Sequence, residues 1–195
     1  MGDSLRRFEI MPTIFSHAIF STAMGAAYAD RPMPARFWIF AGICSVLPDL
    51  DVIAFGFGIP YRSVWGHRGF THSLLFAVLA GCCIALCGFR EEEFAEMKRG
   101  RRSLAVFFIL AIASHLLLDS LTNGGLGVAA FAPFENARYF APFRPIRVSP
   151  IGADFFSFYG LQVLASEIVW VWMPALALVL LARLYRRTMR AGQTI

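Results

Sequence analysis

Residues 103–121 read SLAVFFILAIASHLLLDSL, an apolar run about long enough to cross the hydrocarbon core of a bilayer. The run contains no Gly or Pro, and its ionisable residues, His115 and Asp119, are four positions apart. Residues at that spacing share one face of a helix, about one turn apart. Ionisable groups inside a membrane segment are costly to bury and are usually functional. The stretch therefore predicts a membrane helix carrying an imidazole and a carboxylate that can chelate one cation.

The rest of the sequence has the same apolar character. Hydrophobic residues make up 57% of the 195 residues and charged residues only 16%, which is more apolar than ordinary soluble domains. Further apolar segments lie at about residues 12–29, 37–57, 70–89 and 161–182. We therefore predict an all-α fold, a polytopic membrane helix bundle of about five spans. It forms a single domain over residues 1–195, with a long extramembrane loop at residues 122–160 before the last span.

Basic residues gather at the ends of the apolar segments. Residues 90–102 and residues 183–190 are both rich in Arg and Lys, and cytoplasmic loops carry such an excess. This pattern predicts that both regions are cytoplasmic and that residues 58–69 and 122–160 lie outside. Arg6 and Arg7 balance the charges after the first segment, so that segment has no predicted direction and could also be re-entrant or a cleaved signal peptide. Because the basic residues flank apolar runs, nucleic-acid binding is not expected.

The other ionisable residues of the apolar segments fall at the same predicted membrane face. The candidate metal ligands are His17, Asp49, Asp51, His67, His72, His115 and Asp119, and they include all 4 histidines of the chain. The 4 cysteines show no CxxC spacing. Imidazole with carboxylate and no thiolate suits zinc first, with manganese or iron as alternatives. Because the set exceeds the needs of one tetrahedral ion, either two ions share a bridging carboxylate or some members only orient the ligands.

The sequence does not decide which of four candidates bind the ion directly, because their local backbone is irregular. Asp49 and Asp51 would point to opposite sides of a regular helix, but Pro48 disturbs the backbone, so either or both could face the site. His67 and His72 are too far out of phase for one helical face. Their spacing predicts a loop that folds over the site.

Four sequence elements together resemble a known family. They are Ser16-His17, Leu47-Pro48-Asp49-Leu50-Asp51, His67-Arg68-Gly69-Phe70-Thr71-His72-Ser73, and Ser114-His115 through Asp119 with Thr122. In this order they resemble the YdjM-like family of membrane-bound metal-dependent hydrolases, also described as LexA-binding and inner-membrane-associated. More distantly, the order is similar to the first part of the zinc-dependent phospholipase C and nuclease superfamily. That similarity implies His17, Asp49, His72, His115 and Asp119 as ligands, with Asp119 bridging. No His follows His115, so the later His-rich segment of those enzymes is absent and one or two ions are expected.

The expected function is that of a metal-dependent hydrolase at the outer face of a bacterial inner membrane. A phosphoester in a lipid or lipid-linked substrate is expected, because the site lies at headgroup depth and Arg68, Arg138 or Arg144 could pair with phosphate. Asp51 or Glu167 is the expected general base. The alternative is a non-catalytic membrane regulator or adaptor with a structural metal site. Metal transport is disfavoured because the polar groups do not continue across the membrane, and the sequence leaves the oligomeric state open.

Overall fold

The computed structural model describes residues 12–150 and 152–192 of the chain, which form helices joined by loops. The α-helices are α1 (Ile14–Tyr28), α2 (Ala35–Val46), α3 (Leu74–Cys87), α4 (Glu91–Met97), α5 (Arg101–Ser120), α6 (Phe158–Glu167) and α7 (Met173–Ala191). Three 3-10 segments are η1 (Pro48–Phe57), η2 (Phe70–His72) and η3 (Gly152–Phe156), and η4 (Ile168–Trp172) is a π-helical turn. Between residues 12 and 192, residue 151 excepted, β-type pairing is limited to two isolated bridges. The predicted all-α fold is confirmed.

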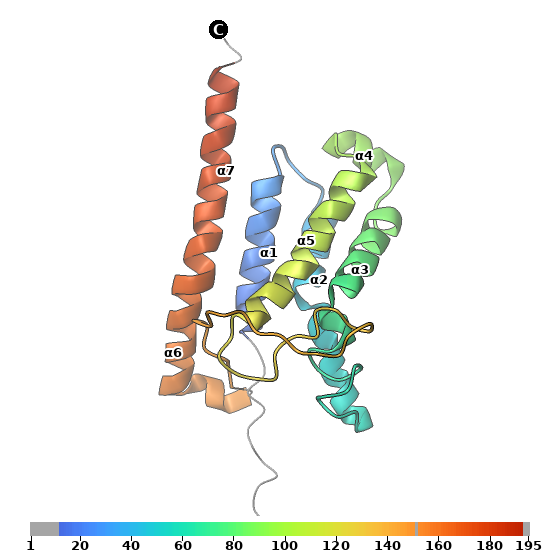
Figure 1. Ribbon diagram of the computed structural model, residues 1–195. Helices are drawn as coiled ribbons and strands as arrows, with labels where there is room; N and C mark the ends of the chain where they lie inside the picture. The colour runs from blue at the N-terminus through green and yellow to red at the C-terminus, as the bar shows by residue number, and fades with distance from the viewer. Residues whose placement is uncertain (1–11, 151, 193–195) are drawn as a thin grey trace, which may run out of the picture.

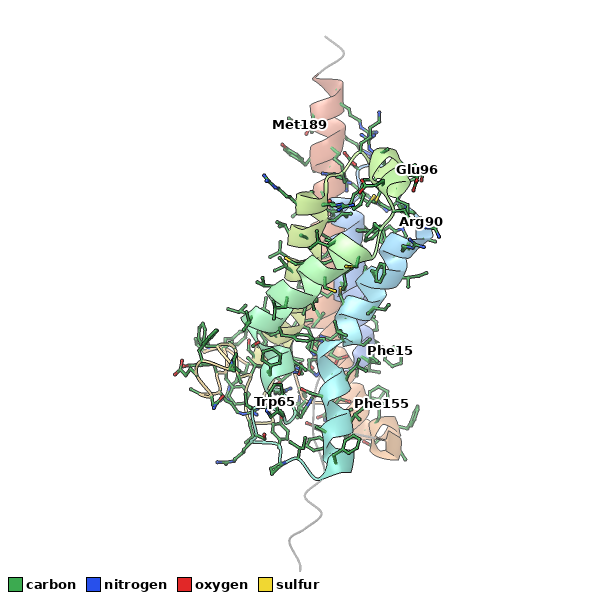
Figure 2. The ribbon with its side chains drawn as sticks, turned by 90° about the vertical axis from the view of Figure 1, so that its right-hand side faces the viewer. Phe15, Trp65, Arg90, Glu96, Phe155 and Met189 are labelled. Atoms are coloured by element: carbon green, nitrogen blue, oxygen red, sulfur yellow. The ribbon has the colours of Figure 1, made fainter. Side chains whose placement is uncertain are left out.

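The helices run side by side in alternating directions (Figure 1). α1, α3 and the continuous rod of α6, η4 and α7 lead away from the end where the long loop lies, whereas α2 with η1 and α5 lead towards it. Figure 2 places Arg90, Glu96 and Met189 at one end of the bundle and Phe15, Trp65 and Phe155 at the other. We call the first the charged end, since it holds α4 and the end of α7, and the second the site end, which holds η1, η2 and the long loop.

The described residues contain two to four candidate membrane spans. Two helices, Arg101–Ser120 and Phe158–Ala191, are each long and apolar enough to cross a membrane. Two bent pairs, α2 with η1 and α3 with α4, raise the number to four if each pair is one span. α1 has only 15 residues, fewer than a full span needs. The five predicted spans are therefore not confirmed in number, and Arg6 and Arg7, which bear on the first segment, lie outside the described residues.

The outer surface of the helices is apolar. Large side chains such as Val106, Leu110 and Leu117 on α5 and Leu176 and Leu180 on α7 are exposed. An apolar surface of this extent is unfavourable in water, whereas hydrocarbon solvates it. The surface therefore agrees with a membrane-embedded bundle.

Close packing of α3 on α5 fixes the central helix. A Cβ atom on Gly81 of α3 would lie 2.6 Å from the backbone nitrogen of Ile109 of α5, so the two backbones meet without a side chain between them. Phe37 and Phe108, both fully buried, fill the adjoining core. This packing sets the rotation of α5, and hence the direction in which its polar residues point.

α1 belongs to the same bundle, because it packs against α2, α5 and α7. Its buried face includes His17, which is 2% exposed. Removal of this segment as a signal peptide would therefore take a packed helix and one candidate ligand out of the bundle.

The long loop, residues 121–150, covers the site end of the bundle (Figure 1). Arg138 fastens it there, because its guanidinium donates hydrogen bonds to the carbonyls of Tyr61, Ser63, His67 and Arg68. Burial lowers the pKa of the Arg138 guanidinium. The region predicted as a loop at 122–160 is thus a cap packed onto the bundle, and α6 begins slightly earlier than the predicted last span.

Candidate metal centre

The centre begins with the last turns of α5. His115 is 1% exposed and Asp119 is fully buried. His115 Nε2 lies 3.9 Å from Asp119 Oδ2, so the four-residue spacing brings both side chains to one face as predicted.

A break between α2 and η1 adds Asp49. The helix ends before Pro48, and the two helical segments meet at an angle of 48°. The proline ring is tolerated here because it stands in the first turn of η1. The bend brings Asp49 Oδ1 to 3.1 Å from His115 Nε2.

The loop before α3 adds His72. Its glycines allow tight folding: a Cβ on Gly66 or Gly69 would lie 2.2 Å from a backbone carbonyl oxygen, so neither position accepts a side chain. The Ser73 hydroxyl then accepts a hydrogen bond from the Phe76 amide and caps α3 immediately after the histidine. His72 Nε2 lies 3.3 Å from Asp49 Oδ1 and 3.3 Å from Asp119 Oδ2.

These contacts bring together four side chains from α5, η1 and η2. Asp49, His72, His115 and Asp119 each offer one ligand atom, and the four atoms lie within 4.8 Å of one another. All but Asp49 are buried, and 13% of the Asp49 side chain is exposed. Two imidazole nitrogens and two carboxylate oxygens form a donor set typical of zinc and similar divalent ions.

Both histidines of this set are held through their other ring nitrogen. His115 Nδ1 donates to the carbonyl oxygen of Ser45 at 2.8 Å. Because a carbonyl only accepts, Nδ1 carries a proton, and Nε2 is the nitrogen that faces the carboxylates and could bind an ion. His72 Nδ1 lies 3.1 Å from Asp51 Oδ2, which fixes its tautomer in the same sense. Metal-binding histidines are commonly oriented in this way by a carbonyl or a carboxylate.

Several buried polar atoms of the centre lack a hydrogen-bond partner among the described residues. They are His72 Nε2, both carboxylate oxygens of Asp119 and both ring nitrogens of His17. An unsatisfied buried polar group costs about 1–3 kcal/mol, and native proteins contain few of them. A cation bound beside His72 Nε2 and Asp119 would satisfy these atoms, and His17 could offer it one ring nitrogen, so the residues fit a metal ion.

His17 joins the centre from α1. Its ring stacks on that of His115 with the centroids 3.8 Å apart, and its Nε2 lies 3.4 Å from Asp119 Oδ1. The other oxygen of Asp119 faces His72 and His115. Asp119 therefore stands between His17 on one side and His72 and His115 on the other, which is the arrangement a bridging carboxylate needs.

Asp51 and His67 form an adjoining group with His72. Asp51 accepts hydrogen bonds from His67 Nδ1 at 2.6 Å, the Arg68 amide at 3.1 Å and the Thr71 hydroxyl at 2.6 Å. Both of its oxygens are thus engaged in holding the loop, whereas His67 Nε2 has no hydrogen-bond partner among the described side chains and backbone.

Arg68 lies inside the centre and has positive φ (58°). Its guanidinium is fully buried, with Nε 3.0 Å from Asp119 Oδ2, and donates to the Gly124 carbonyl and the Thr122 hydroxyl. All of these contacts are with the protein, so Arg68 neutralises Asp119 and ties the long loop to η2.

Glu167 lies apart from both ligand groups. It is fully buried, and its Oε2 accepts hydrogen bonds from the hydroxyls of Thr13 at 2.6 Å and Ser16 at 2.8 Å. The Thr13 amide donates to its other oxygen. A carboxylate is favourable at a helix N-terminus, so Glu167 joins α6 to the start of α1, where His17 is placed.

Sequence reasoning missed two partners of this centre. The Ser45 carbonyl orients His115, and the Thr71 hydroxyl donates to Asp51. A backbone carbonyl leaves no trace in residue type. Thr71 stands within the quoted motif, but nothing in that motif indicates where its hydroxyl points.

Comparison with known proteins agrees with the resemblance of the motifs. A family model described as YdjM inner membrane protein matches residues 11–190. Inner membrane protein YbcI of Escherichia coli strain K12 is 40% identical over 170 residues, which cover 86% of this chain and 95% of that protein. No solved structure matches. With helices able to span a membrane and a match over most of its length, the chain belongs to the YdjM inner membrane protein family.

Proposed function

We propose that this protein is a metal-dependent hydrolase of the inner membrane. The convergence of Asp49, His72, His115 and Asp119 carries the proposal, because two oriented imidazoles and two carboxylates share one buried space. Zinc suits this donor set first, with manganese or iron as alternatives. A divalent ion held there would lower the pKa of a coordinated water to about 7 and stabilise developing negative charge.

The protein groups around this centre would hold the ion and orient its ligands. His72 and His115 present Nε2, since Asp51 and the Ser45 carbonyl hold their Nδ1 atoms. Asp119 would bridge towards His17. Asp49 is the one member of the four that is partly exposed, which supports access of substrate and water to the centre beside this residue.

The general base stays a prediction. The contacts of Asp51 and Glu167 favour positioning roles, because Asp51 holds the η2 loop and Glu167 holds the start of α1. Asp51 is 8% exposed and lies beside His72, so it is the better placed of the two. Arg68 is committed to Asp119 and is therefore better explained as part of the centre than as a substrate contact.

A phosphoester of a lipid or lipid-linked molecule is the proposed substrate. The centre lies at one end of an apolar bundle, and the nearby Phe57 and Trp65 of η1 and its loop are exposed, as expected at a membrane interface. Of the arginines considered for phosphate, Arg138 is occupied by backbone carbonyls. Arg144 is exposed over the ring of Phe140 and is the one left to meet an anionic headgroup.

The burial of three of the four ligands favours one rival, a structural metal site in a non-catalytic membrane protein. The test is elemental analysis of purified protein beside assays of phosphate and headgroup release with zinc or manganese. His115→Ala should lose both bound metal and activity, whereas Ser120→Ala, a change at a partly exposed residue of the same helix, should keep both. Metal retention without hydrolysis would support the structural role, and hydrolysis that survives both a chelator and His115→Ala would refute the proposed mechanism.

A further inference from the structure

A basic cavity lies at the charged end of the bundle, opposite the metal centre. Its volume is about 510 Å³, and it is lined by Ala26, Ala29, Asp30, Trp38, Arg183, Arg186, Arg187 and Arg190. The lining comes from the end of α1, the start of α2 and the last turns of α7. None of these residues takes part in the metal centre.

The positive charge of this cavity has little compensation. Positions 183, 186, 187 and 190 are three or four apart, so the four arginines share one face of α7, where like charges repel. The Asp30 carboxylate pairs with Arg31 and with Arg99, neither of which lines the cavity. In the described part of the chain no carboxylate forms an ion pair with Arg183 or Arg187. An anion in the cavity would relieve this repulsion.

The cavity walls are already in place. Arg186 donates to the carbonyls of Ala26 and Ala29 at the end of α1, and to that of Ala182. Cations are favourable at a helix C-terminus, so the end of α1 already serves as the partner of the Arg186 guanidinium. Arg190 donates to the Asp30 carbonyl at 3.2 Å. Arg183 and Arg187, both exposed, are left to contact a ligand.

We propose that this cavity binds a phosphate group of net negative charge, as carried by an acidic phospholipid headgroup or by a soluble phosphate. Guanidinium groups match phosphate oxygens with paired hydrogen bonds. Basic pockets between membrane helices recognise lipid headgroups in this way. Leu180, Leu181 and Leu184, exposed on the same stretch of α7, supply apolar surface for acyl chains, and Trp38 is suited to the interface. Topogenic charge accounts for arginines near a membrane end, but it does not require them to line one cavity.

The test uses the full chain in detergent, mixed with equal amounts of phosphatidylglycerol and phosphatidylcholine, with bound lipid counted by native mass spectrometry. Wild type should retain phosphatidylglycerol. Arg183→Gln with Arg187→Gln should weaken this binding about 30-fold, at about fivefold for each basic residue. Arg102→Gln removes one exposed arginine at the same end but outside the cavity, and binding should stay within about twofold. Because the changed side chains are exposed, folding is checked by size exclusion and thermal unfolding.

Inorganic phosphate distinguishes the two sources of the ligand. Displacement of phosphatidylglycerol only by high phosphate concentrations would assign the cavity to a lipid headgroup. Tight phosphate binding that the double variant abolishes, without a lipid preference, would assign it to a soluble phosphate. Equal binding of phosphatidylglycerol and phosphate by wild type and the folded double variant would overturn the proposal.

Discussion

Replacing Asp51 by Asn tests whether this residue orients the centre or binds an ion directly. The Asp51 carboxylate has four donors around it: His67 Nδ1, the Arg68 amide, the Thr71 hydroxyl and His72 Nδ1, at 2.6–3.1 Å. Asn keeps one acceptor oxygen but turns a donor towards one side of this group and removes the charge. The best orientation of Asn therefore keeps the contacts of one oxygen and loses those of the other.

The magnitude follows from these contacts. Loss of a carboxylate that orients a ligand histidine typically weakens metal binding about 10–100-fold. A buried donor left without its acceptor costs about 1–3 kcal/mol of folding free energy. Asp51→Asn should therefore keep the metal stoichiometry, lower the affinity within this range and lower the unfolding temperature of the metal-free protein.

The assay is zinc competition with a chromogenic chelator, combined with elemental analysis. Asp30→Asn serves as the control, since Asp30 forms a partly exposed ion pair with Arg99 at the charged end and its loss should leave zinc affinity unchanged. If Asp51→Asn removes one of two bound ions, Asp51 is a ligand of a second ion. If the affinity falls no more than in the control, the orienting role is wrong.

Three further changes test the packing and charge of the bundle. Gly81→Val should destabilise the protein by about 1–3 kcal/mol, because the backbone of α5 occupies the space that the new side chain needs. Gly42→Ala should not destabilise it, because nothing lies within 4 Å of a Cβ at that position. Thermal unfolding in detergent compares the two variants. Glu167→Gln should lower the free energy of unfolding by about 1.5–3 kcal/mol, because it weakens charge-assisted hydrogen bonds to α1, and it should leave zinc affinity unchanged. Lost hydrolysis at unchanged stability would instead indicate that Glu167 is a general base. Arg68→Met should lower the free energy of unfolding of the metal-free protein by about 3–5 kcal/mol, because Asp119 loses its buried guanidinium partner, and added zinc should reduce this loss. An equal loss with and without zinc would count against a metal ion beside Asp119.

The parts predictable from sequence were those governed by helical periodicity and by the cost of burying charge. The spacing of His115 and Asp119 places them on one face of α5 whatever the rest of the fold does. Polar residues in apolar segments have to meet each other or water, and this predicts that His17, Asp49 and His72 converge on α5. The structure brings these five side chains together at one end of the bundle.

The parts not predictable from sequence depend on irregular backbone. Arg68 reads as a loop residue free to meet a substrate, yet its positive φ turns the side chain inward to Asp119. Glu167 reads as a polar group entering the last span, but it is the last residue of α6 and lies beside the N-terminus of α1, which provides three donors for it. The count of five spans is not confirmed, because α1 has only 15 residues and apolar composition does not reveal the length of a helix.

The balance of charge in the centre bears on how many ions it holds. Asp49, Asp51 and Asp119 bring three carboxylates into a largely buried space, Arg68 brings one guanidinium, and a histidine that binds an ion through Nε2 would do so as a neutral imidazole. Two negative charges remain, which a single divalent ion neutralises. Buried charge without a partner is strongly disfavoured, so a second ion requires further negative charge, such as a phosphate group of the substrate. Elemental analysis should therefore find one ion per chain in the resting protein and a second only when a phosphate ester or inorganic phosphate is present. Two ions in the absence of any phosphate would show that the centre binds them without the charge of a substrate.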